Sequence, residues 1–279
     1  MNNDEEVKVY WQPGCSSCLK TKEFLKDNGI PFKSVNVLED KTGFEDLQRF
    51  GVKMVPIVAK GDGANGAVFR DVAEVAGFDY QAHKMLEPSI MKDKILQINL
   101  SASKYLEQIP DEELDTLLPG RPRSYRQLVY HIFNIQDIFL KRVEDNAPYT
   151  YESLLSILPK EMKTKKDLID YGIEVGNRFS NWWSRAGTSI DFKQPGNVYY
   201  GEVILHEVLE RTAWHSGQHV RQVALMLKEK LNIEPKPPLD NTIFHGLPMP
   251  KNIWDNERSF SEKSYSGQAL SSVEDFKNL

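Results

Sequence analysis

Two cysteines near the start of the chain are spaced for thiol–disulfide exchange. Cys15 and Cys18 are the only cysteines in the sequence, and two serines separate them. The turn residues Pro13 and Gly14 precede them, so we expect both at the start of a helix, where the helix dipole lowers the pKa of a thiol. This spacing predicts Cys15 as the nucleophile and Cys18, one turn further on, as the residue that resolves the mixed disulfide.

Two other interpretations of this cysteine pair stand beside the redox one. The cysteines could be unreactive, or they could be half of a zinc site, although a site of four cysteines is excluded by their number. The acidic, polar start Met1–Glu6 is not typical of a signal peptide. We therefore expect a cytoplasmic protein, in which a Cys-x-x-Cys pair indicates redox activity.

Three histidines downstream are candidates for a metal site. His215 and His219 lie four residues apart on an expected helix, and therefore share one of its faces. His131, on an earlier expected helix, could supply a third nitrogen. Three neutral imidazoles that leave coordination positions open can activate water or a thiol. His206 precedes His215 by nine residues, which places it on the opposite side of the helix.

The residues alone leave alternatives open at this site. His215 and His219 could be exposed helix histidines, and His131, in the apolar run Val129–Phe133, fits a hydrogen-bonded core histidine equally well. Arg211, one turn before His215, could anchor a carboxylate or could pair with Glu207.

Aromatic residues beside these candidates also allow two interpretations. Phe179, Trp182 and Trp183 fit a helix core better than a ligand platform. Tyr199 and Tyr200, at the start of the last expected helix, could line the metal cleft.

The elements that must position these residues differ between the two parts of the chain. Up to residue 85, short apolar runs alternate with a helical period, and from Pro88 long helical periods replace them. Ser124 with Gln127, and Thr164 with Asp167, match helix-capping patterns. We expect strands over 7–11, 32–37, 55–59 and 67–72, short helices over 16–28 and 44–50, and long helices over 89–108, 125–144, 164–185 and 200–231.

The first part resembles the glutaredoxins. The stretch Val7–Cys18 is similar to the opening of that family, and Met54-Val55-Pro56 resembles its Thr-Val-Pro loop, although Ser16-Ser17 replaces its usual Pro-Tyr. The resemblance implies that Pro56 is cis and faces Cys15. Gly77-Phe78-Asp79 resembles the family's glycine–aspartate turn near the thiol ligand, so Val55, Pro56, Gly77 and Asp79 are expected to contact a bound thiol.

The second part resembles the DinB-like proteins. The similarity rests on Ser124–Ile132 and on Trp214–Gln222, which contains a His-x-x-x-His motif. That family consists of metal-binding four-helix bundles related to thiol S-transferases and to a thiol-dependent maleylpyruvate isomerase. The resemblance implies that His131, His215 and His219 are the metal ligands. The position of Arg211 on the same helix face makes it the candidate contact for a carboxylate of a thiol cofactor or substrate.

Together these observations predict two domains: an α/β thioredoxin-like fold followed by an all-α four-helix bundle with a Pro-rich C-terminal extension. The expected boundaries are 1–86 for the glutaredoxin-like domain, 87–232 for the bundle, and 233–279 for the extension, which should pack partly on the bundle, to about Trp254. The expected cofactors are a divalent metal, zinc first with nickel, iron and manganese as alternatives, and glutathione or another low-molecular-weight thiol such as bacillithiol or mycothiol.

The functional hypothesis is an enzyme in which a metal-activated thiol attacks a small-molecule electrophile, and in which the dithiol processes the thiol adduct. One alternative is a thiol-dependent cis–trans isomerase, and another is a redox sensor with a metal-stabilised bundle. A formal net charge of −5 without a basic stripe argues against nucleic acid as a partner. No apolar run approaches the ~20 residues of a membrane span, and a homodimer is expected from the resemblance alone.

Overall fold

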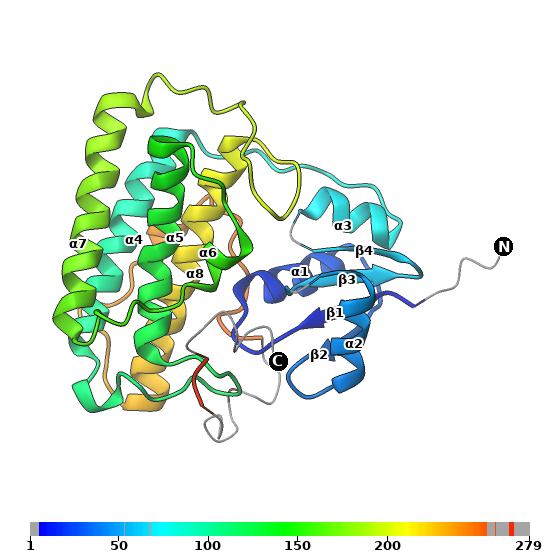
Figure 1. Cartoon of the computed structure of the whole chain (residues 1–279), viewed down its shortest axis with the longest axis horizontal. Helices are drawn as coiled ribbons and strands as arrows, with labels where there is room; N and C mark the ends of the chain where they lie inside the picture. Colours follow the sequence, from blue (N-terminus) through cyan, green and yellow to red (C-terminus); the bar gives the residue numbers. More distant parts are fainter. Residues whose placement is uncertain (1–5, 53, 67, 256–259, 261–267, 271–279) are drawn as a thin grey trace.

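The computed structural model describes residues 6–52, 54–66, 68–255, 260 and 268–270. Within these residues a small mixed sheet with flanking helices comes first, and a helical unit follows it, which confirms the expected fold class (Figure 1). The elements of the first unit are β1 (Lys8–Trp11), α1 (Ser16–Asp27), β2 (Lys33–Asn36), α2 (Lys41–Arg49), β3 (Ile57–Lys60), β4 (Gly63–Asn65) and α3 (Phe69–Ala76). Those of the second are α4 (Pro88–Gln108), η1 (Asp111–Glu113), α5 (Tyr125–Asp145), α6 (Tyr151–Leu155), α7 (Lys165–Trp182), η2 (Trp183–Gly187), α8 (Leu205–Leu231) and η3 (Asn241–Phe244).

The sheet has the order β2-β1-β3-β4, with β1 parallel to β2 and antiparallel to β3. Because side chains alternate across a strand, β1 contributes residues to the apolar layers on both faces of the sheet. Val9 packs with Leu25 of α1 and Val72 of α3 on one face, and Tyr10 packs with Leu47 of α2 on the other. The sheet therefore holds α1, and with it the cysteine pair, on a rigid support.

The helical unit is built on the long helices α4, α5, α7 and α8, which pack against one another around a continuous apolar core. Both expected capping boxes are present. The Ser124 hydroxyl accepts from the Gln127 N–H at the start of α5, and Thr164 does the same with Asp167 at the start of α7. The Ser124 cap fixes the start of α5 at Tyr125, six residues before His131.

The strand expected over 67–72 is wrong. Residue 67 lies outside the described residues, and Phe69–Ala76 forms helix α3, while the last strand is the shorter β4 at Gly63–Asn65. The buried residues Val72, Ala73 and Ala76 follow a helical spacing, which a short apolar run does not separate from a strand.

The last long helix begins at Leu205, five residues later than expected. Gly201 has φ +144°, a conformation that a helix cannot include, and the Glu207 carboxylate accepts the N–H of Ile204 at 2.9 Å. Tyr199 and Tyr200 therefore belong to the loop before α8. Similarly, α2 begins at Lys41 rather than Phe44, because the Asp40 side chain accepts from the N–H groups of Thr42 and Gly43.

The segment after α8 returns across both domains (Figure 1). Gln218 of α8 donates to the carbonyls of Asn252 and Ile253, and the N–H groups of Lys251 and Asn252 donate to Glu23 of α1. Trp254 is 3 % exposed, and its ring occupies the space where a Cβ on Gly14 would stand. The extension thus packs on the bundle as expected and also on the first domain, whereas most of 256–279 lies outside the described residues.

No helix in the described part of the chain combines the length and the hydropathy needed to cross a bilayer.

Candidate functional site

The cysteine pair caps the N-terminus of α1. Cys15 is the N-cap residue, its Sγ accepts the N–H of Cys18 at 3.2 Å, and the two sulfurs form a disulfide. Cys15 is half-buried, whereas Cys18 is 1 % exposed. An attacking thiol therefore reaches Cys15 first, which is the geometry expected of a nucleophile and a shielded resolving cysteine.

The three candidate histidines come together from α5 and α8. The ring centroids of His131 and His219 lie 4.9 Å apart, those of His215 and His219 also 4.9 Å, and those of His131 and His215 5.3 Å. One nitrogen of each ring lies within 4.8 Å of the others, and all three residues are buried. His206 is directed elsewhere, because its Nε2 lies 2.8 Å from the Leu86 carbonyl oxygen.

Polar neighbours orient two of the rings. The Gln222 Oε1 lies 2.7 Å from Nδ1 of His219, and since a carboxamide oxygen only accepts, this Nδ1 carries the proton. The Ser156 Oγ lies 2.5 Å from Nδ1 of His131 and also receives the Asn134 amide. With Nδ1 as the donor, Nε2 is the ligating nitrogen in both rings, and Nε2 of His219 lies 3.2 Å from Nε2 of His215. This arrangement is typical of metal-ligating histidines.

The environment keeps the imidazoles neutral. Burial lowers the pKa of His219 to about 3, with a further contribution from the positive charge of Arg123. Burial also lowers the pKa of His131 and His215 well below the usual range. Three uncharged nitrogen donors, with no fourth donor grouped with them among the described residues, fit a divalent ion with open coordination positions, and imidazole accepts zinc, iron, nickel or copper.

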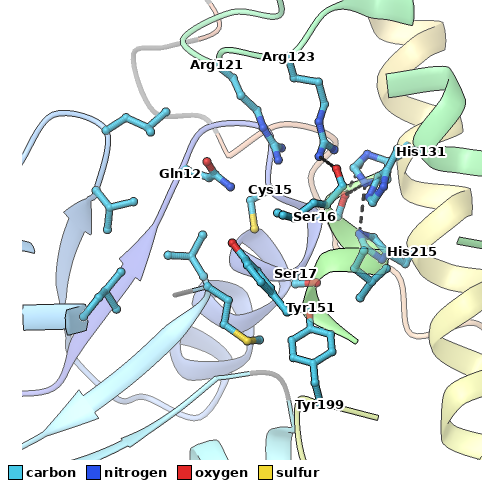
Figure 2. A pocket seen from close by; sticks show the side chains of 18 of the residues that line it. Gln12, Cys15, Ser16, Ser17, Arg121, Arg123, His131, Tyr151, Tyr199 and His215 are labelled. Carbon is cyan, nitrogen blue, oxygen red and sulfur yellow. Dashed lines mark hydrogen bonds between the residues drawn. The ribbon is translucent and has the colours of Figure 1, made fainter. Parts of the chain in front are cut away.

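Cys15 and the three histidines line one cavity between the domains, with a volume of about 130 Å³ (Figure 2). The Ser16 Oγ lies 3.4 Å from both ring nitrogens of His219, and Arg211 Nη2 donates to the Ser17 Oγ at 3.1 Å. The two residues between the cysteines thus contact the histidine-bearing helix directly. The sequence patterns alone do not predict that these two sets of residues share a cavity.

The Val55-Pro56 bond is cis, as the resemblance implied, and Val55 lines the cavity with Cys15. Pro56 is buried and is not among the lining residues. The placement of Gly77 and Asp79 beside the thiol ligand is wrong, since both are exposed and neither lines the cavity. The glycine that lies against the Val55-Pro56 loop is Gly66, where a Cβ would stand 2.2 Å from the Pro56 carbonyl oxygen.

Arg211 lines the cavity rather than pairing with Glu207, whose carboxylate caps α8. Its guanidinium lies 4.7 Å from the centroid of the Tyr200 ring and 5.4 Å from that of Trp214, in addition to its bond to Ser17. Arg211 therefore connects the two domains beside the cavity and remains a candidate contact for a carboxylate.

The aromatic candidates divide between core and cavity. Phe179 and Trp182 are fully buried in the bundle core, and Trp183 packs against it, as the helix spacing indicated. Tyr199 lines the cavity, whereas Tyr200 is buried beside it and lines a neighbouring one.

Sequence reasoning missed several residues of the cavity. Arg121 and Arg123 project into it from the loop before α5, and Tyr151 approaches from α6 (Figure 2). Ser156, which orients His131, follows the same short helix. A signal for the arginines was present, because the connector Gly120-Arg121-Pro122-Arg123 carries two cations without an acidic neighbour.

Comparisons with known proteins agree with this division of the chain. The glutaredoxin family profile matches residues 7–63, and the DinB superfamily profile matches residues 101–223. The chain is 34 % identical over 64 residues to the N-acetyl-S-hydroxy-L-cysteine reductase of Bacillus subtilis (strain 168), which covers 23 % of this chain and 69 % of the relative. It is 38 % identical over 53 residues to an uncharacterized glutaredoxin-like 8.6 kDa protein in the rubredoxin operon of Clostridium pasteurianum, covering 19 % of this chain and 71 % of the relative. No solved structure matches the chain.

The matched segments contain the two candidate sites. Residues 7–63 include the cysteine pair and the Val55-Pro56 loop, and residues 101–223 include all three histidines. The first segment indicates thiol redox chemistry, and the second a metal-binding, thiol-related function. The domain boundaries 1–86, 87–232 and 233–279 stay predictions. The chain thus belongs to the glutaredoxin family through its N-terminal domain, which is joined to a helical domain of the DinB superfamily.

Proposed function

We propose that the protein is a metal- and thiol-dependent enzyme whose two domains act on one thiol adduct in the cavity between them. The observation that carries this proposal is the direct contact between the sites: Ser16, which follows Cys15, lies 3.4 Å from the ring of His219. Two independent active centres would not need to share a cavity lined by both.

The dithiol performs the redox half of the reaction. The Cys15 thiolate attacks one sulfur of a mixed disulfide and forms a new S–S bond, and the other sulfur leaves as a thiolate that takes up a proton. Cys18 then attacks the Cys15 sulfur, releases the second thiol and closes the Cys15–Cys18 disulfide, the bond seen in the structure. The enzyme loses two electrons in this cycle, and two molecules of a low-molecular-weight thiol restore them as they join into their own disulfide.

A sulfenic acid fits the same sequence of steps. The name of the B. subtilis relative describes reduction of an S-hydroxy cysteine. Attack of Cys15 on such a sulfur displaces hydroxide, which takes a proton and leaves as water, and the resulting mixed disulfide is resolved by Cys18 as before.

The histidines supply the second half of the site. His131, His215 and His219 would hold the ion through one nitrogen each, while Ser156 and Gln222 keep the rings of His131 and His219 in orientation. A divalent ion bound there would lower the pKa of a thiol and so supply a thiolate for attack on an electrophile at neutral pH. Tyr151 and Tyr199 line the cavity beside this reaction.

Metal content is the first test of this proposal. We expect about one metal per chain in untagged protein measured by plasma mass spectrometry, and loss of that metal in the His215→Ala/His219→Ala double variant. His245→Ala is a matched control, because His245 is exposed and lies outside the triad. Absence of metal from the wild-type protein would leave the dithiol as the basis of function.

Turnover of thiol adducts separates the proposal from its alternatives. We expect Cys15→Ser and His131→Ala each to lower the rate with a mixed disulfide or a thiol-transfer substrate by at least about 100-fold. A cis–trans isomerase would lose activity in His131→Ala but keep it in Cys15→Ser. A redox sensor would bind metal without turning over any of these substrates.

A further inference from the structure

Arg121 and Arg123 lie in the turn that precedes α5, and both side chains enter the cavity between Gln12, Cys15 and His131 (Figure 2). Their backbone is fixed by hydrogen bonds from Leu118 N–H to the Arg123 carbonyl and from Arg121 N–H to the Leu118 carbonyl. The two side chains are 8 % and 7 % exposed. They are therefore held in place by the fold rather than extended into solvent.

Both guanidinium groups have unused hydrogen-bonding capacity. The Nη1 atom of each is buried without a hydrogen-bond partner among the described residues. Among the described residues, the Arg123 side chain makes one hydrogen bond. Its Nη2 donates to the Leu155 carbonyl oxygen at the long distance of 3.4 Å. A buried donor without an acceptor is costly, and two such donors that open into one cavity indicate a missing acceptor.

The charges of these arginines are also incompletely balanced. Burial lowers the pKa of Arg123 to about 10, which leaves it protonated at neutral pH. Burial together with the charge of Arg123 lowers the pKa of Arg121, and the negative charge of Asp255 opposes this shift. Tyr151, whose pKa burial raises to about 12, stays neutral beside Arg123. Two neighbouring buried guanidinium groups with Asp255 as the anion that acts on one of them favour an anionic ligand.

We propose that Arg121 and Arg123 form a carboxylate-binding subsite beside Cys15, so that the thiol adduct processed in this cavity carries a carboxylate. This inference rests on the proposed function, and it names the substrate class of the same cavity. Guanidinium groups bind planar carboxylates through paired hydrogen bonds, which matches the free Nη1 atoms. With the carboxylate on the arginines, the sulfur of the ligand lies between Cys15 and the histidines.

Direct binding of probes that cannot react tests this subsite without any turnover. We would titrate the protein as purified with N-acetyl-S-methyl-L-cysteine, with its primary amide, with S-methylglutathione and with inorganic phosphate, using calorimetry. We expect the wild-type protein to bind the carboxylate form at least about tenfold more tightly than the amide. In the Arg121→Gln/Arg123→Gln variant this preference should disappear.

Controls separate ligand binding from a structural role. Arg185→Gln removes an exposed arginine of η2 and should leave the preference unchanged. If the arginines serve only the fold, the double variant loses thermal stability and the wild-type protein shows no preference for the carboxylate. If they form the subsite, the ligand-free variant is at least as stable as the wild type, because two uncompensated buried charges are gone. Arg123→Gln alone provides the same comparison if the double variant does not fold.

The probes also distinguish between sources of the anion. Tighter binding of S-methylglutathione than of N-acetyl-S-methyl-L-cysteine would place a carboxylate of the thiol cofactor on the arginines, and equal binding would place the cysteine carboxylate there. Binding of phosphate but not of either carboxylate would overturn the proposal, as would equal affinity for acid and amide. Metal content measured on the same samples shows whether the histidine site is intact. A failure of the proposed thiol transfer can then be distinguished from a failure of carboxylate binding by the arginines.

Discussion

Lys20 is a cation held against aromatic rings one turn beyond the cysteine pair. Its Nζ lies 4.1 Å from the centroid of the Trp214 ring and 4.9 Å from that of Phe69. Burial lowers its pKa to about 7, while Glu210 raises it and Arg211 lowers it further. Because Lys20 of α1 contacts the Trp214 ring of α8, its protonation couples the stability of the domain interface to pH.

The pH dependence of unfolding tests this coupling. The unfolded chain binds this proton up to about pH 10.4 and the folded chain to about pH 7, so the free energy of unfolding should rise with pH across that window. We expect Lys20→Met to remove this rise, so that the free energy of unfolding of the variant minus that of the wild type falls by roughly 3 kcal/mol between pH 6.5 and pH 9.5. Denaturant unfolding of both oxidised proteins at several pH values measures this difference in the free energy of unfolding.

Lys228→Met is the matched control, because Lys228 is an exposed lysine near the end of α8. A difference between wild type and Lys20→Met that stays constant over this pH range would contradict the assignment. Comparing each variant with the wild type at the same pH cancels the titration of all other groups.

At the scale of single helices, α7 lies close against α5 at Gly172. A Cβ on Gly172 of α7 would stand 2.6 Å from Cζ of Phe133, which is fully buried on α5. This glycine sets how near α7 lies to the helix that carries His131. Its position cannot accept even a methyl group unless the aromatic ring moves.

We expect Gly172→Ala to lower the free energy of unfolding by about 1 to 3 kcal/mol, although alanine is the better helix former in isolation. Thermal unfolding followed by circular dichroism measures the change. Phe133→Leu should restore part of the stability in the double variant, since it makes room for the added methyl group. A stability gain in Gly172→Ala would show that the close approach is not a constraint.

The elements also show which parts of the site the sequence can predict. Cys15 with Cys18 and His215 with His219 are local patterns, because residues three or four apart on a helix necessarily lie close together. Arg121 and Ser156 meet the histidines only through tertiary packing of loops, for which the sequence has no period. Gly66, and not Gly77, lies against the Pro56 loop. The apolar run after Gly66, which fits a strand by its composition, forms helix α3.

At the scale of the whole molecule, the segment after α8 joins the two domains. It contacts α8 through Gln218, α1 through Glu23, and the loop before Cys15 through Trp254. The cavity between the domains depends on their relative position. The segment should therefore help to set the geometry of this cavity, although none of its own residues takes part in the reaction.

We expect Trp254→Ala to weaken this attachment by about 3 kcal/mol, the usual cost of removing a large buried aromatic side chain. The two domains should then unfold in separate calorimetric transitions, and protease should cut the 77–87 connector faster than in the wild type. Ile90→Ala serves as the control, because Ile90 is 44 % exposed. A single unchanged transition in Trp254→Ala would show that the domains stay together without the segment.

The order in which the chain is made gives this segment a further consequence. Domains fold largely as units during synthesis, beginning at the N-terminus. The sheet with the cysteine pair and the helices with the histidines are both complete before Lys251 and Trp254 are made. The dithiol is therefore formed early and can meet cellular oxidants and thiols while it is still open. We expect its docking against the histidines to become stable only after that segment has been made, so the shared cavity reaches its final shape later than either of the two sites that line it.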